Sequence, residues 1–426
     1  MKERQRRPSS PGSRPFGIVS VNDAALLARV DASLDAACLN DPVLEDRGES
    51  ESHTRSAGVL ELRRKDTRPH MFDYQRDLAG QMSALIAQGG GGGLISLPTG
   101  GGKTRTALCG LLDAMASTPD PTRIGWLAPT KELLEQAHSQ AASLWLQTGN
   151  APDITLALRR NARVGSSISF LTPQQVRYKD DVDVVVFDEA HQMAAETFAR
   201  AAHRLLRGDG KGVLIGLSAT PGRTNRGEMP ALLNVFGSRL IISAILGTNP
   251  VRELQDRGVL AYLRFLKMSQ RPPEELTLAD RIRISARAAV HSVRKGRKTL
   301  IFCESLQASR VTAAVLRSWG VRASYVEGSL PDAERGARLR AFANGSLEVI
   351  ANQKLLTAGY DLPAVSALVL QRVIGSAIEF EQIVGRAARG PLTGGSSTAR
   401  ILEFDSHLEL HGLPQSYYRY QDYGWA

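Results

Sequence analysis

The segment PTGGGKT at 98–104 holds the residue types that bind phosphate groups. Glycine adopts the positive φ angles that turn successive backbone N–H groups toward an anion, and three glycines, Gly100 to Gly102, stand together here. The amine of Lys103 can reach nucleotide phosphates, and the hydroxyl of Thr104 can ligate Mg²⁺. The segment therefore predicts a nucleotide site, although Gly-Lys-Thr in a glycine-rich turn also arises by chance.

A second run of glycine, Gly89 to Gly93, precedes the apolar stretch that leads into this segment. It follows a helical pattern, so we expect a helix stop and a flexible link with no anion role. The strict phosphate-loop pattern asks for glycine where this chain has Leu97. We interpret Leu97 as the end of a strand, and we take the strand–loop–helix order as the evidence for the site.

Two adjacent carboxylates could complete the same site. Asp188 and Glu189 follow the apolar run DVVVF at 183–187, which is typical of a buried parallel strand. Such a strand delivers both side chains to the carboxyl edge of the sheet, where open α/β sheets bind ligands. Asp188 suits the shell of Mg²⁺, and Glu189 suits the positioning and deprotonation of a water. A solvated turn is the plain alternative, which the upstream phosphate segment weakens.

Short apolar runs alternate with helical patterns from about residue 68 onward, and this alternation predicts parallel sheets. The runs fall into two groups on either side of a polar segment at 267–277. The predicted fold class is therefore α/β, with two domains in tandem. The expected strands are GLISL, RIGWLAP, ISFLTP, DVVVFD and GVLIGLSAT, then KTLIFC, RASYVEG, LEVIANQ, ALVLQRV and ARILEFD.

The composition of the 426 residues, 42% hydrophobic and 23% charged, is that of an ordinary soluble protein. No apolar run reaches about 18 residues, so a membrane span is not expected. The three cysteines form neither a CxxC pair nor a zinc spacing, so a cytoplasmic location is expected. The formal net charge of +10 favours polyanionic partners, of which nucleic acid is the commonest.

The chain is expected to divide into four regions. These are an N-terminal extension at 1–66, domain 1 at 67–262, domain 2 at 263–411 and an aromatic tail at 412–426. The extension combines a disordered basic tail at 1–15 with an amphipathic helix at 21–39. The aromatic tail could stack on bases, but such tails more often pack over their own domain. The basic run at 294–298 is either a nucleic-acid patch or a solvated run before a strand.

Most of the chain, from about 68 to 411, is similar to the superfamily 2 helicases and translocases. The segments that resemble the family's motifs, in the family's order, are DYQRD (Q motif), LPTGGGKT (I), APTKELLEQ (Ia), FLTPQQV (Ib), DEAH (II), LSATPGR (III), LIFCES (IV), LLTAGYDLP (V) and QIVGRAARG (VI). Motif I in this superfamily often starts with a residue other than glycine, as at Leu97. Motifs III, V and VI look most like those of DNA-acting branches, namely type III restriction motors, the XPB group and RadD-like helicases.

The resemblance implies two tandem RecA-like domains with parallel sheets and an ATP site in the cleft between them. Tyr74 and Gln75 would contact adenine, and Thr104 with Asp188 would hold Mg²⁺. The residues that would be catalytic are Lys103, Asp188, Glu189, Arg386 and Arg389. The positions that would bind ATP are Gln75, Thr99, Gly100, Gly101, Gly102, Lys103, Thr104, Gly359 and Asp361.

Motif VI would supply a cation from the second domain. Arg386 and Arg389 are three residues apart, so we expect them on one helix face as arginine fingers, with Arg389 as the principal one. A solvated basic turn is the plain alternative. The residues that resemble the link between the γ-phosphate and the domain interface are His191, Ser218, Thr220 and Gln382. The candidates for contacts with nucleic-acid phosphates are Thr130, Lys131, Thr172, Gln174 and Thr357.

The leading hypothesis is an ATP-dependent DNA helicase or translocase acting in repair, recombination or defence. It would use ATP and Mg²⁺, couple hydrolysis to domain closure, and bind nucleic acid largely without regard to sequence. An RNA helicase is the enzymatic alternative. A second alternative is a motor, or ATP-gated binding subunit, of a multi-protein restriction or defence system whose partner is a nuclease or repair factor.

Overall fold

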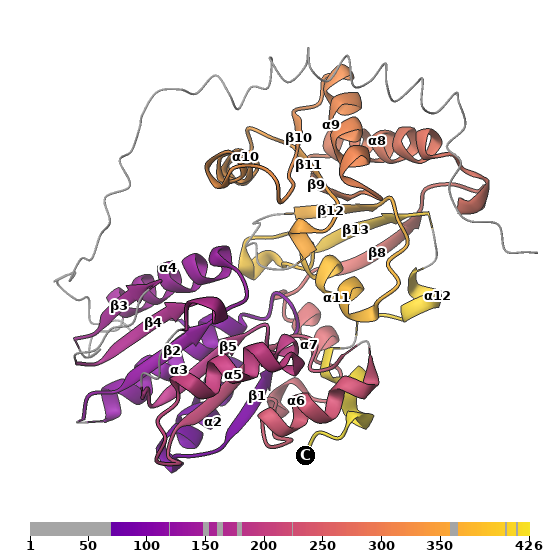
Figure 1. Cartoon of the computed structure of the whole chain (residues 1–426). Coiled ribbons are helices and arrows are strands. Elements are labelled where there is room, and N and C mark those ends of the chain that lie inside the picture. Colours follow the sequence, from indigo (N-terminus) through magenta and orange to yellow (C-terminus); the bar gives the residue numbers. More distant parts are fainter. Residues whose placement is uncertain are drawn as a thin grey trace, which may run out of the picture.

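The computed structural model describes residues 70–118, 120–147, 153–159, 165–176, 181–223, 225–357, 365–404, 407–414 and 416–426. They form two α/β domains, each built around a parallel sheet, so the predicted fold class is confirmed (Figure 1). The predicted basic tail and the helix at 21–39 lie outside these residues, as do Gly359 and Asp361. None of the helices in the described ranges has the length and apolar character needed to cross a membrane.

The first domain contains a seven-stranded sheet in which every strand pair is parallel. Its strands are β1 (Gly92–Ser96), β2 (Arg123–Leu127), β3 (Thr155–Leu158), β4 (Ser167–Leu171), β5 (Val184–Asp188), β6 (Val213–Ser218) and β7 (Leu240–Ile241). Their order across the sheet is β3-β4-β2-β5-β6-β1-β7. β4, β5 and β6 are buried along their whole length, as expected of parallel strands that are covered on both faces.

Helices cover both faces of this sheet. One layer contains α2 (Asp73–Gln88), α3 (Lys103–Ser117) and α4 (Lys131–Gln147), and the other contains α5 (Glu196–Leu205) and α6 (Met229–Val235). Successive residues of β5 alternate between the two cores: Val186 belongs to the first and Phe187 to the second. α7 (Pro250–Asp256) follows β7 and places Leu254 in the first core.

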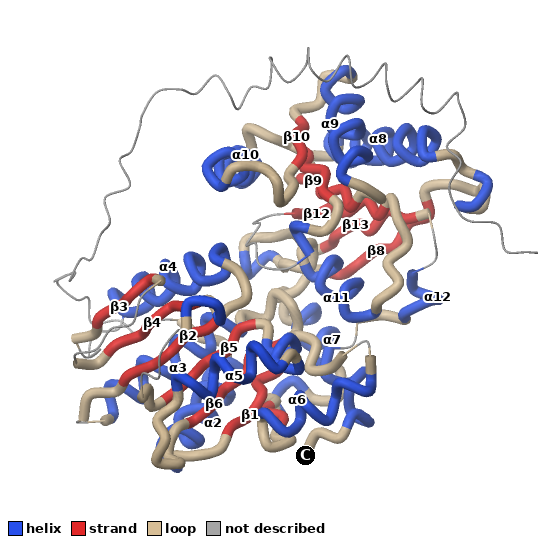
Figure 2. Tube along the Cα trace, in the orientation of Figure 1, coloured by secondary structure: helices blue, strands red, loops and turns tan. Residues whose placement is uncertain are grey.

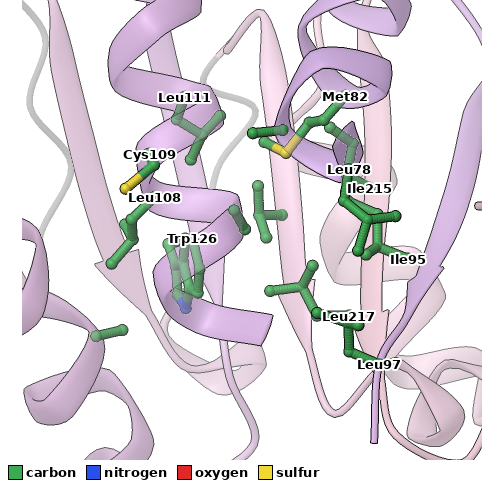
Figure 3. Close-up of a cluster of buried hydrophobic side chains, with 14 of the residues drawn as sticks. Leu78, Met82, Ile95, Leu97, Leu108, Cys109, Leu111, Trp126, Ile215 and Leu217 are labelled. Atoms are coloured by element: carbon green, nitrogen blue, oxygen red, sulfur yellow. The ribbon is translucent and has the colours of Figure 1, made fainter. Parts of the chain in front are cut away.

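Figure 3 shows the core under α2 and α3, which supports the phosphate segment. Its labelled members include Leu78, Met82, Ile95, Leu108, Leu111, Trp126, Ile215 and Leu217, all fully buried. Burying one such side chain stabilises the fold by roughly 1.5–3 kcal/mol. The loop between β1 and α3 is therefore held by two elements that are both anchored in this core.

The second domain contains a six-stranded parallel sheet in the order β10-β11-β9-β12-β13-β8. Its strands are β8 (Tyr262–Lys267), β9 (Lys298–Phe302), β10 (Ala323–Tyr325), β11 (Val349–Asn352), β12 (Val365–Leu370) and β13 (Thr398–Glu403). Its helices are α8 (Leu278–Arg294), α9 (Leu306–Ser318), α10 (Asp332–Asn344), α11 (Ala377–Gly385) and α12 (His407–His411). Figure 2 shows the strands of both domains flanked by helices.

All ten expected strand segments contain strands, and the described residues form three further strands that were not expected: β3, β7 and β8. β8 starts at Tyr262, so the chain enters the second sheet before the polar segment at 267–277. The strand escapes prediction because it is an edge strand with a half-exposed burial pattern and includes Arg264 and Lys267. A short, partly polar edge strand lacks the apolar run that marks a central one.

The structure corrects the interpretation of the first glycine run. Gly89, Gly90 and Gly91 do form a turn with positive φ angles after α2. Gly92 and Gly93, by contrast, are the first residues of β1. A Cβ atom on Gly92 would lie 2.5 Å from the carbonyl oxygen of Leu214 on β6, so a side chain there is excluded by the neighbouring backbone.

We expect the Gly92→Ala variant to lower the free energy of unfolding by about 1–3 kcal/mol, because the methyl group must displace backbone of β6. Gly80→Ala is the matched control. Gly80 lies within α2 with nothing within 4 Å of an added Cβ, so this variant should gain about 0.5–1 kcal/mol. Urea unfolding measures both values, and equal midpoints for the two variants would contradict the strand assignment.

Candidate nucleotide site between the two domains

The phosphate segment forms the loop between β1 and α3 at the carboxyl end of β1. Gly100 and Gly102 both have a φ of 88°, a conformation that L side chains rarely adopt. Gly102 is the N-cap of α3, and no side chain of the described residues makes a capping hydrogen bond there. The first N–H groups of α3 and the positive end of its dipole therefore suit a phosphate group.

Two buried side chains of α2 hold this loop in place. The Tyr74 hydroxyl donates to the Gly101 carbonyl over 3.0 Å, and Gln75 Nε2 donates to the same oxygen over 3.1 Å. Gln75 Oε1 in turn accepts from the Phe72 amide at 3.1 Å. The sequence interpretation assigns Tyr74 and Gln75 to adenine. In this structure they position the phosphate loop, and the adenine contact stays a prediction.

The two carboxylates stand at the carboxyl end of β5, on the same edge of the sheet as the loop. The Thr104 hydroxyl donates to Asp188 Oδ2 over 3.3 Å, so two oxygen groups converge beside the loop. Oxygen groups of this kind fit Mg²⁺, which takes few protein ligands and completes its shell with phosphate oxygens and water. Glu189 has a φ of 55°, an unusual value for a residue with a side chain and one that is common at functional sites.

Burial shifts the charged groups at this site. Burial raises the pKa of Asp188, the negative charge of Glu189 raises it further, and Lys103 opposes both. Burial lowers the pKa of Lys103, and the two carboxylates oppose that change. Burial also lowers the pKa of Arg386, whereas the charge of Glu189 raises it. Arg386 of the second domain therefore lies within electrostatic range of the carboxylate and of Lys103.

The structure corrects the expectation that Arg386 and Arg389 share one helix face. α11 ends at Gly385, and Arg386 is its C-cap. Arg389 lies beyond the helix and pairs with Leu260 in an antiparallel bridge. Burial lowers the pKa of Arg389 too, but Arg386 is the arginine whose pKa responds to Glu189. The choice of Arg389 as the principal finger stays a prediction.

His191 connects the two domains through both of its ring nitrogens. Nδ1 lies 3.3 Å from Ser218 Oγ and 3.5 Å from Glu189 Oε2, and Nε2 lies 3.4 Å from Gln382 Nε2 of α11. Burial lowers the pKa of His191, and the negative charge of Glu189 opposes this change. A neutral ring fits these contacts, because Nδ1–H then donates toward Ser218 and Glu189 while Nε2 accepts from Gln382.

Ser218 extends this network into the loop after β6. Its hydroxyl donates to the Thr220 carbonyl over 3.0 Å and accepts from the Thr220 amide at 3.1 Å. The structure thus brings together all four residues that were expected to couple the domains. A shift of α11 would therefore be transmitted to Ser218 through Gln382 and His191.

Some residues at the domain interface were not expected from the sequence. A Cβ on Gly385 would lie 2.4 Å from the Thr99 side chain, so the glycine lets α11 approach the phosphate loop. Arg335 of α10 pairs with Glu132 of α4 over 2.7 Å, which joins the domains at a second place. Only the fold brings these pairs together, because each pair is separated by about 200 residues or more.

The candidates for nucleic-acid contact lie on the same edge of the sheets. Thr130 and Lys131 follow β2 and are exposed, whereas Thr172 follows β4 and is buried. Gln174 is exposed in the short helical turn after β4, and Thr357 ends a similar turn after β11. β4 and β2 lie on the far side of β5 from β1 in the first sheet, so these positions are separated from the phosphate loop.

Comparison with known families agrees with this geometry. Residues 68–223 match the family described as the type III restriction enzyme, res subunit, and residues 281–391 match the helicase conserved C-terminal domain. Each match falls within one of the two α/β domains. The chain is therefore similar to a restriction-enzyme subunit over its first domain and to the helicase C-terminal domain over its second.

Individual relatives divide between DNA and RNA. The ATP-dependent RNA helicase SrmB of Haemophilus influenzae is 27% identical over 344 residues, covering 75% of this chain and 74% of that protein. The ATP-dependent DNA helicase RecG of Acidithiobacillus ferridurans is 25% identical over 325 residues, covering 70% and 42%. Both relatives are named as ATP-dependent helicases, one of RNA and one of DNA.

A solved structure shows the same fold. The ATP-dependent Type ISP restriction-modification enzyme LlaBIII bound to DNA superposes with a TM-score of 0.54 at 15% identity, covering 79% of this chain and 28% of that chain. The chain also spans only 29%, 54% and 58% of the length of three other curated relatives. The activities of these relatives as whole proteins are therefore only proposals for this chain.

The His191–Gln382 contact predicts non-additive losses. We expect His191→Ala and Gln382→Ala each to lower nucleic-acid-stimulated ATP hydrolysis, because each breaks the same link between the domains. The stimulated rate of the double variant should lie within about twofold of that of the less active single variant, because the effects of two residues that act through one contact do not add. Gln192→Ala is the control beside His191. Steady-state ATPase assays measure all four proteins, and a strictly multiplicative loss would argue against the link.

Proposed function

We propose that this protein is an ATP-dependent DNA helicase or double-strand translocase. The observation that carries the proposal is the packing of α11 on the nucleotide site: Gln382 reaches His191 beside Glu189, and Gly385 packs on Thr99 of the phosphate loop. Arg386, the next residue, thereby comes within electrostatic range of Glu189 and Lys103. Phosphoryl transfer depends mainly on positioning and on stabilisation of charge. A site assembled from two domains can therefore couple hydrolysis to their relative movement.

Each residue has a defined part in the proposed reaction. The loop N–H groups and Lys103 bind the phosphates of ATP, and Glu189 positions and deprotonates the attacking water. Mg²⁺, held by Thr104 and Asp188, would neutralise charge on the phosphates when bound. Arg386 stabilises the charge that develops on the γ-phosphoryl group from the side of the second domain.

Hydrolysis in this mechanism requires closure of the domains. Gln382 and Arg386 both lie at the end of α11, so they reach the first domain together. His191 and Ser218 then relay the position of α11 to the loop after β6. Binding of ATP would favour the closed arrangement of the domains, and release of phosphate would allow them to open again.

Nucleic acid would lie across the carboxyl edges of both sheets, beside the exposed Thr130, Lys131 and Gln174. Contacts from hydroxyl, amide and backbone groups to phosphates carry little sequence information, so binding should be largely sequence-independent. The net charge of +10 also favours a polyanion, and affinity should fall as salt rises.

The match of residues 68–223 to a restriction-enzyme subunit favours DNA as the nucleic acid. The similarity to an RNA helicase supports the enzymatic alternative. The same restriction-family match supports a further possibility, in which the chain is a motor or ATP-gated subunit and a nuclease or repair partner supplies cleavage. Tight co-purification of a second protein, with activity only in its presence, would favour that role.

A polynucleotide-dependent ATPase panel tests the proposal. We expect duplex DNA to stimulate hydrolysis more than single-stranded DNA or RNA. Lys103→Ala and Glu189→Gln should each lower the stimulated rate by about 10²-fold or more, because one removes a phosphate contact and the other the general base. Lys211→Ala changes an exposed lysine outside the site and is the matched control. Hydrolysis that no polynucleotide changes would rule out the helicase mechanism.

The two arginines can be separated by the same assay. We expect Arg386→Ala to lower kcat by about 10³-fold with ATP still bound, the lower end of the effect of an arginine finger. Arg389→Ala should have a smaller effect, since Arg386 is the one that responds to Glu189. Fluorescent-nucleotide binding and thermal unfolding check that both variants bind ATP and fold. A larger loss for Arg389→Ala would instead bear out the sequence-based prediction that Arg389 is the principal finger.

A further inference from the structure

Residues 416–426, called the strap below, leave the second domain and run along the first (Figure 1). They follow α12, which is fixed on domain 2: the ring of His407 accepts a hydrogen bond from the Ile374 amide at 3.0 Å and stacks on Phe380. The strap ends beside β7 of domain 1, where the Leu240 amide donates to the Ala426 carbonyl over 3.3 Å. The strap therefore has an attachment on each domain.

On domain 1 the strap contacts the loop that follows Ser218 and Thr220. The Tyr420 ring lies so close to Gly222 that an added Cβ would be 2.2 Å from Cδ1 of the ring. Trp425 Nε1 donates to the Pro221 carbonyl over 2.7 Å. Tyr423 packs edge-on against Tyr420 at 5.3 Å between ring centroids. Aromatic rings thus cover the loop on which the network of His191 ends.

On domain 2 the strap contacts α11. Arg419 Nε donates to Glu381 Oε1 over 2.7 Å, and the Glu381 side chain is only 5% exposed. Arg419 also donates to the His411 carbonyl, which ties the strap to α12. Tyr420 is near the same carboxylate, whose charge adds to burial in raising the pKa of the Tyr420 hydroxyl. Two adjacent residues of the strap therefore contact the two domains: Tyr420 packs on Gly222 of domain 1, and Arg419 pairs with Glu381 of domain 2.

These contacts form a second connection between α11 and the loop after β6. Gln382 reaches His191 directly, and the neighbouring Glu381 reaches the loop after Ser218 through Arg419 and Tyr420 of the strap. A cavity of about 30 Å³ lies between the domains, and its lining residues include Thr99, Ala219 and Glu381. Two independent routes therefore join the end of α11 to the same loop.

We propose that the strap is a positioning element that favours the closed arrangement of the two domains. The contacts of Arg419 with Glu381 and of Tyr420 with Gly222 can both exist only while α11 and the loop after β6 are close together. An element that interacts with one arrangement and not with the other shifts the population toward it. Arg419 and Tyr420 thereby set how readily ATP meets a complete site, although neither touches the reacting atoms.

The experiment follows domain distance and ATP turnover in the same variants. Dyes on the exposed positions Ser139 of α4 and Ser318 of α9 report the distance between the domains by energy transfer. We expect Arg419→Gln and Tyr420→Ala to lower the closed fraction in the absence of nucleotide. Both should raise the KM for ATP by about fivefold or more, the lower end of what coupling between sites is typically worth, with a smaller change in kcat.

Tyr420→Phe is the matched control. The Tyr420 hydroxyl is buried with no hydrogen-bond partner among the described residues, so its removal keeps the packing on Gly222. This variant should behave like the wild type in both readouts. Arg419→Gln tests the proposal without removing an aromatic ring, so a folding defect of Tyr420→Ala leaves it testable.

The proposal would be overturned if energy transfer and KM were both unchanged in Arg419→Gln and Tyr420→Ala, including the case in which a lowered melting temperature is the only effect. The turnover readout rests on the proposed function, whereas the distance readout does not. A protein without polynucleotide-stimulated hydrolysis but with strap-dependent energy transfer would therefore refute the helicase mechanism and leave the strap standing.

Discussion

Charged side chains from two domains share one buried site, and each is costly to bury without the others. Asp188 is 3% exposed, and burial lowers the pKa of Lys103 and of Arg386. Removing one partner from a buried ion pair typically costs about 3–5 kcal/mol, because the remaining charge is left uncompensated. The site in domain 1 is therefore electrostatically incomplete until domain 2 brings Arg386 to it. In the proposed mechanism, closure of the domains and catalysis therefore depend on the same interaction.

Glycines decide how closely the two domains can approach. Gly385 stands where a side chain would overlap Thr99, and Gly390 where a Cβ would lie 2.3 Å from the Gly258 carbonyl. Glycine is required at both positions because α11 packs directly against the phosphate loop, and the residues after α11 pack against the segment that follows α7. The His191 network and the Arg335–Glu132 pair then fix the contact at two further places. The strap adds a route outside the nucleotide site.

The sequence is informative where chemistry is local. Short runs of residues are enough to predict the phosphate loop, the carboxylates after β5 and the ten expected strands, because the residue types in each run indicate its role. β8 was missed because a half-exposed edge strand has no apolar run. The relation of Arg386 to Arg389 was misjudged because spacing alone does not show that α11 ends at Gly385. The aromatic tail was expected to pack over its own domain, but Tyr420 and Trp425 contact the loop after β6 of domain 1. The sequence does not show this, since Trp425 and Pro221 meet only through tertiary packing.

Coupling of hydrolysis to movement in the proposed mechanism requires that ATP and nucleic acid together close the two domains on one another. The most direct measurement is the distance between labels on Ser139 and Ser318 while an unhydrolysable ATP analogue and duplex DNA are added separately and then together. We expect the two ligands together to populate a single short distance, and each alone to leave a mixture. A distance distribution that neither ligand nor their combination changes would contradict the claim.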